Sequence, residues 1–70
     1  MRPKDVCRRI ERLGGVYTTT KGSHRTYVVR YGEHGRVITW VPMHPGEIST
    51  GTLRKIERDL EPALGRRWLR

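Results

Sequence analysis

Residues 21–31 read KGSHRTYVVRY, a turn followed by a strand, and the fold can be worked out from this stretch. Residues 25–31 are rich in β-branched and aromatic side chains, which favour strands, and Gly22 with Ser23 makes a turn in front of them. The turn also places His24 at the mouth of the strand. An imidazole can exchange a proton near neutral pH, so His24 is a candidate for proton transfer.

Two further strands are predicted on either side. Residues 16–20 (VYTTT) and 36–41 (RVITWV) have the same β-favouring composition. Residues 32–35 (GEHG) form a four-residue hairpin connection, and Pro42 ends the third strand because proline cannot donate to a ladder. Three strands joined by short turns predict an antiparallel meander.

Helices are predicted at both ends of the meander. Near the N-terminus, Pro3 suits a first helical turn and glycines at 14–15 end the helix. Its buried stripe follows helical spacing: Val6, Cys7, Ile10 and Leu13. Ser49 or Thr50 can cap the second helix, and Pro62 halts it or starts a last short turn.

The second helix has an apolar stripe and a charged outer face. The stripe is Leu53, Ile56 and Leu60, and the outward residues are Arg54, Lys55, Glu57, Arg58 and Asp59. The tail, 65–70, is a frayed end, a packed turn or a contact arm. The predicted fold is α+β: a single domain, 1–70, of two layers in the order α-β-β-β-α, with both helices on one face of the sheet.

Alternation along the central strand predicts which face is covered. Tyr27, Val29 and Tyr31 form the greasier set, so we assign them to the helices. The open face then carries His24, Thr26, Val28 and Arg30. A bulge near Gly22 would move His24 out of this register.

Charge limits the choice of partner. The chain has 15 Lys+Arg against 7 Asp+Glu, a net charge of +8 and a pI near 10.8. This balance favours polyanions, with nucleic acid ahead of membrane, although it also fits simple solubility or an arginine-rich proteome. No long apolar run or signal-peptide core is present, and Cys7 has no disulfide partner, so we expect a cytoplasmic protein with no membrane contact.

Three motifs together resemble the HicA family of toxin mRNA interferases. They are 21–24 (KGSH) after the first strand, 41–44 (VPMH) at the end of the third, and 51–56 (GTLRKI) opening the last helix. The order of elements also resembles the double-stranded-RNA-binding domain. The resemblance extends from the first helix to about Leu60 and leaves the tail outside.

This resemblance implies a metal-independent endoribonuclease that cleaves mRNA, needs no cofactor and is silenced by a HicB antitoxin. His24 corresponds to the family's catalytic histidine. Arg25 stands where the family often carries a second histidine, which removes one possible helper.

The chemistry that follows is a transphosphorylation through the RNA 2′-OH. We expect His24 to act as general acid or base, while Lys21, Arg25 or Arg30 binds the phosphate. Two auxiliary residues are considered. His44 either moves a second proton or only structures its loop, and Ser23 is better explained by hydrogen bonding in its turn.

Other hypotheses about the function stay open. A non-catalytic RNA-binding module of the same fold would need the cations and not the imidazole, and an interaction protein would depend on apolar surface. The histidines and Cys7 contain no close ligand pair, so no metal site is predicted. Trp40 and Trp68 could stack on bases, but a sheet-filling role is slightly favoured for Trp40.

Overall fold

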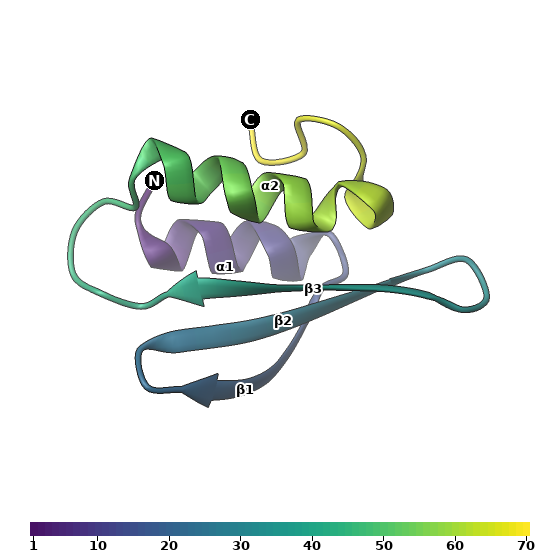
Figure 1. Ribbon diagram of the computed structural model, residues 1–70, viewed down its shortest axis with the longest axis horizontal. Coiled ribbons are helices and arrows are strands. Elements are labelled where there is room, and N and C mark those ends of the chain that lie inside the picture. The colour runs from purple at the N-terminus through teal and green to yellow at the C-terminus, as the bar shows by residue number, and fades with distance from the viewer.

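The computed structural model describes residues 1–70 as two helices packed on a three-stranded antiparallel sheet. The elements are α1 (Pro3–Arg12), β1 (Val16–Lys21), β2 (His24–Tyr31), β3 (Gly35–Pro42) and α2 (Thr50–Leu64). The strand order is β1-β2-β3 (Figure 1). The α+β prediction, with its α-β-β-β-α order and its likeness to the double-stranded-RNA-binding fold, is confirmed.

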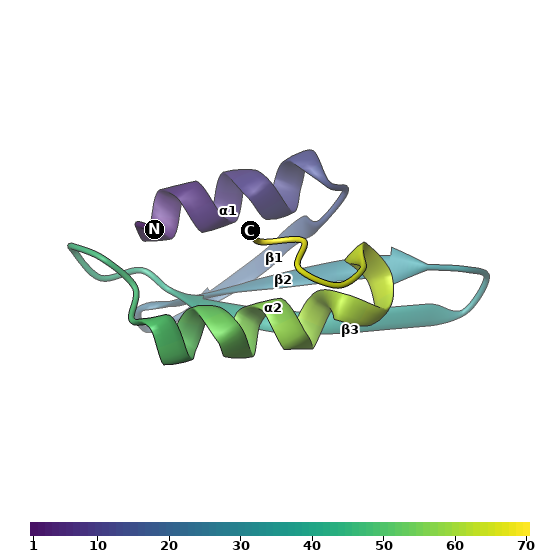
Figure 2. The ribbon, with the colours of Figure 1, turned by 90° about the horizontal axis from the view of Figure 1, so that it is seen from above.

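Both helices cover the same face of the sheet. The Tyr27 hydroxyl of β2 donates to Glu11 of α1, and the Thr39 hydroxyl of β3 donates to Asp59 of α2 over 2.9 Å. Tyr27 and Thr39 are directly paired across the ladder, so their side chains point to one side. The two helices lie side by side there, and the C-terminal tail lies between them (Figure 2).

The buried stripe of α1 is shorter than predicted. Val6, Cys7 and Ile10 are buried, and the backbone N–H of Arg2 donates to Asp5 at the start of the helix. Leu13, predicted as a core residue, is 43% exposed because the helix ends at Arg12 and Leu13 lies in its C-cap. The prediction for Leu13 was wrong.

The covered face of β2 was predicted correctly except at its end. Tyr27 and Val29 are buried, whereas Tyr31 is exposed because the β2–β3 hairpin extends beyond the helices (Figure 1). Thr26 lies on the open face but is also buried, directly opposite the large side chain of Trp40. The connection between β2 and β3 is three residues, 32–34, since Gly35 already pairs with Tyr31.

The β1–β2 turn is a two-residue loop with a bulge further back. Lys21 pairs with His24, so only Gly22 and Ser23 remain in the loop, and Gly22 has a φ of +58° that suits glycine at the first loop position. The register shifts between Tyr17 and Thr19, away from Gly22. Thr18 is therefore the extra residue of a β-bulge, and its hydroxyl donates to the Thr26 carbonyl over 3.3 Å.

The second helix begins where predicted and runs past its proline. The Ser49 hydroxyl accepts from the Thr52 N–H, which caps the helix. Pro62 lies inside α2 and does not halt it, and the two residues that follow it in the helix, Ala63 and Leu64, pack against the core.

The tail is a packed segment. Trp68 and Leu69 are buried in the core, and Trp68 donates from its indole N–H to the Glu57 carbonyl over 2.8 Å. Glu57 was predicted to face solvent but is only 6% exposed, because the tail folds over it. Its carboxylate accepts from the Leu69 N–H and pairs with Arg70 at 3.3 Å.

No helix is long and apolar enough to cross a membrane.

Candidate functional site

An open groove of about 520 Å³ lies where the β1–β2 turn, the end of β3 and the start of α2 meet. The elements that form it lie at one end of the molecule (Figure 1). Seven residues line the groove: Lys21, His24, Trp40, Pro42, His44, Thr52 and Lys55. It therefore brings together three of the residues predicted for the site, Lys21, His24 and His44.

Strand pairing puts Lys21 and His24 in one row. Lys21 pairs with His24, which in turn pairs with Pro42, so the three side chains share the open face. Regular alternation from Tyr17 would have turned Lys21 to the opposite face. The bulge at Thr18 shifts the alternation of side chains by one residue and so turns Lys21 to the open face. It is therefore the reason why an ammonium group lies next to the imidazole.

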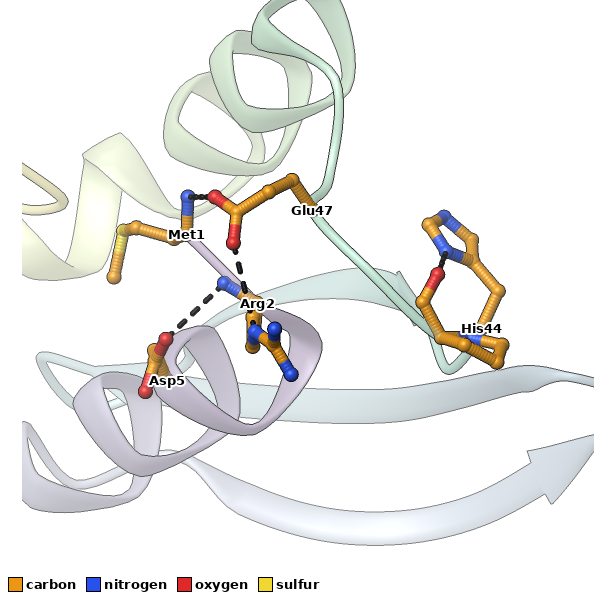
Figure 3. A network of polar contacts seen from close by, with 6 residues as sticks. Met1, Arg2, Asp5, His44 and Glu47 are labelled. Carbon is orange, nitrogen blue, oxygen red and sulfur yellow. Dashed lines mark hydrogen bonds and ion pairs between the residues drawn. The ribbon is translucent and has the colours of Figure 1, made fainter.

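His44 stands between two grooves. It lines the groove of His24 and also a second hollow of about 390 Å³, whose other charged residues come from the N-cap of α1 and from the helix itself: Arg2, Lys4, Asp5 and Arg8. Nδ1 of His44 lies 3.0 Å from the Pro45 carbonyl (Figure 3). Because a carbonyl only accepts, Nδ1 is assigned as the donor, and the neutral ring then keeps Nε2 as an acceptor.

Ion pairs tie the loop that carries His44 to the N-terminal end of α1. Glu47 pairs with the Met1 ammonium at 2.9 Å and with Arg2 at 3.7 Å (Figure 3). The Ile48 N–H donates to the Met1 carbonyl, and the Met43 N–H donates to the carbonyl of Ser23. These bonds anchor the loop at both ends, so His44 is held against the β1–β2 turn.

The charged side chains that line the groove are those of two lysines, one of which is paired with a nearby carboxylate. Lys21 and Lys55 line the groove, and no carboxylate does. The Lys55 ammonium lies 2.8 Å from Asp59 and 5.7 Å from the centre of the Trp40 ring. Both helices begin at this end of the molecule, so their positive dipole ends add to the field (Figures 1 and 2). This end of the protein suits a phosphate group.

Arg25 points away from the groove. It follows His24 on the strand and so faces the helices, where its guanidinium lies 4.9 Å from the centre of the Tyr17 ring. Its Nε is buried without a hydrogen-bond partner. The structure thus separates Arg25 from His24 and gives it a packing environment.

Arg30 shares the open face with His24 but lies at the other end of β2. Arg30 is six positions further along the strand than His24, a separation of about 20 Å. With Arg36, its cross-strand partner, Arg30 lines a separate hollow of about 280 Å³. The cations predicted around His24 therefore belong to three places.

Sequence reasoning missed Lys55, Thr52 and the exposure of Trp40. Lys55 and Thr52 lie within the 51–56 motif, which was the one indication in the sequence that they belong to the site. Helical spacing alone could not show that they line the groove. No group of three or more histidine, cysteine, aspartate or glutamate side chains is placed to hold a metal ion.

Comparison with known proteins identifies the class. A family model described as the HicA toxin of bacterial toxin-antitoxin systems matches residues 3–61, which span α1, all three strands and most of α2. The chain belongs to the HicA toxin family. It is thus a toxin of a toxin-antitoxin pair, and a cognate antitoxin is implied. No curated protein matches the chain.

Proposed function

We propose that this toxin is a metal-independent endoribonuclease that cleaves mRNA at the groove of His24. The proposal is supported by the cross-strand pair that His24 and Lys21 form on the open face. The groove that contains this pair is lined by cations and by no carboxylate. A phosphate drawn into this groove would meet an imidazole that can move a proton at neutral pH.

The proposed reaction uses the substrate's own nucleophile. The 2′-oxygen of the ribose attacks the adjacent phosphorus and loses its proton, and the bond from phosphorus to the 5′-oxygen of the next nucleotide breaks as that oxygen gains a proton. The products are a 2′,3′-cyclic phosphate and a 5′-hydroxyl. His24 performs one of these two proton transfers, for which a positioned group typically gives about 10²–10⁴-fold.

Two neighbours complete the proposed site. His44 lines the same groove with Nε2 available, so it is the candidate for the second proton transfer. Lys21 and Lys55 stabilise the charge that builds up on the phosphorane oxygens. Ser23 contributes through its backbone, since its carbonyl fixes the His44 loop to the turn.

The proposed partners follow from this charge. We expect a HicB-like antitoxin to neutralise the toxin by placing acidic surface over the groove. We also expect the toxin to act in the cytoplasm, where mRNA is present.

The test is RNA cleavage with EDTA present, by the wild-type protein, by His24→Ala and by His34→Ala. His34 is the matched control because it lies in the exposed β2–β3 tip, at the other end of the sheet from the groove. We expect His24→Ala to lose at least about 100-fold in cleavage while RNA affinity is kept, and His34→Ala to cut normally.

Other results would contradict the proposal in distinct ways. Equal cleavage by wild type and His24→Ala would remove His24 from the mechanism. Loss of cleavage on adding EDTA would make the reaction metal-dependent. Binding by all three proteins with no cleavage by any of them would favour the alternative function, a non-catalytic RNA-binding module.

A further inference from the structure

The face of the sheet opposite the helices is a continuous surface built from four cross-strand rows, which we call the open face. The ladder pairs give the rows as Lys21–His24–Pro42, Thr19–Thr26–Trp40, Val16–Val28–Ile38 and Arg30–Arg36. The two middle rows carry the apolar side chains of Val16, Val28, Ile38 and Trp40 beside two threonines, and the two ends of the surface are cationic.

The apolar middle is well exposed. Trp40 is 44% exposed and Ile38 43% exposed, and Val16 is more exposed still. An indole that served only to fill a sheet would be covered, as Trp68 is. Trp40 therefore presents a large aromatic surface to whatever approaches the groove.

The charge on this face has one sign. Lys21 lies at one end and Arg30 with Arg36 at the other, and none of the four rows contains an aspartate or glutamate. A ligand that covers the whole face must therefore combine apolar, flat groups with negative charge. Nucleic acid with its bases exposed has this combination, since bases stack on aromatic rings and phosphates meet the cations.

We infer that the open face binds single-stranded RNA, with one base stacked on Trp40 and a phosphate held by Arg30 and Arg36. The inference rests on the proposed function in taking RNA as the ligand, and it deepens that function by naming the form of the RNA. A duplex keeps its base faces stacked inside the helix, so it cannot offer a base to Trp40.

The position of Trp40 ties the stacked base to the groove. Trp40 is paired with Thr26, which is two residues from His24 on the same strand, a separation of about 7 Å. Lys55 lies near the ring and lines the same groove. A base on Trp40 would therefore belong to a nucleotide next to the phosphate at His24, and Trp40 would set its position.

The test measures RNA affinity in a His24→Ala background, so that no substrate is consumed. Trp40→Ala is compared with Trp40→Phe, which keeps an aromatic ring, and with Leu13→Ala, a control of nearly equal exposure at the end of α1. The probes are one unstructured RNA oligonucleotide and the same oligonucleotide annealed to its complement.

We expect Trp40→Ala to weaken single-strand binding by about 5- to 150-fold, the range measured when a stacking residue is removed. Trp40→Phe should recover most of this loss, and Leu13→Ala should bind as the background protein does. Duplex RNA should bind more weakly and be insensitive to Trp40. Arg30→Ala with Arg36→Ala should weaken single-strand binding and flatten its salt dependence.

Three outcomes would overturn the inference. The first is equal affinity for single strand and duplex, and the second is unchanged single-strand affinity in Trp40→Ala, with folding of that variant checked by circular dichroism. The third is that Trp40→Ala weakens only antitoxin binding or self-association, which would make the open face a protein interface. Cleavage is measured separately on the wild-type background, so failure of the His24 mechanism leaves these binding results standing.

Discussion

Replacing Trp68 by alanine should destabilise the protein strongly, although Trp68 lies in the tail beyond the last helix. Trp68 is only 7% exposed and is part of the main core cluster. Its indole N–H donates to Glu57, and its carbonyl accepts from Arg9 over 3.2 Å. The tail therefore joins α1 to α2.

The size of the effect follows from this burial. Truncating a buried tryptophan to alanine costs about 3–5 kcal/mol, and we expect the lower end, about 3 kcal/mol, because the tail has no helix or strand and can relax into the gap. A chain of this length has a free energy of unfolding of about 4–10 kcal/mol. A loss of about 3 kcal/mol should lower the melting temperature by about 12–24 °C.

The assay is urea unfolding followed by far-ultraviolet circular dichroism, because the substitution removes one of the two tryptophan fluorophores. Trp40→Ala is the matched control: the same change at an exposed tryptophan should cost less than about 1 kcal/mol. Equal and small losses for the two variants would refute our account of the tail and make it a frayed end.

Three further predictions concern stability. Burial, helped by the hydrogen bond to Glu11, raises the pKa of the Tyr27 phenol, so the native state holds this proton when the unfolded chain has lost it. The free energy of unfolding should therefore fall as pH rises above about 10, and Tyr27→Phe should reduce that fall in urea titrations; an unchanged slope would contradict this. Gly15→Ala should cost about 1–3 kcal/mol in the same assay, because the new Cβ would clash with an Ile10 methyl group. Gly51→Ala, with open space around it, should instead stabilise by up to about 1 kcal/mol, and a loss there would show that glycine is needed at the start of α2.

Most of the fold could be predicted because its signals are local. The β-branched strands, the glycine turns and the helical stripes each act over a few residues, and the ends of α1 and β1 lie close to the predicted ones. The error at Glu57 arose because a distant segment decides its burial. Glu57 is a charged residue on the outer side of its helix, and only the return of the tail makes it buried.

The site was predictable in part for the same reason. His24 and Lys21 flank one turn, so their proximity is local, whereas Lys55 joins them only through the packing of α2 beside β3. Arg25 and Arg30 are near His24 in sequence but not in the groove. Alternation along the strand separates Arg25 from it, and the length of β2 separates Arg30.

The bulge at Thr18 also concerns the pairing register between the edge strand β1 and its neighbour β2. Three consecutive threonines, 18–20, are nearly interchangeable, and a strand exposed along its whole length has little else to select one alignment. A slip of one residue would turn Lys21 to the helix side of the sheet, where Thr20 stands in the native register, and would take its ammonium group out of the row that it forms with His24. The alignment of β1 that the bulge sets thus decides whether this cation lines the groove.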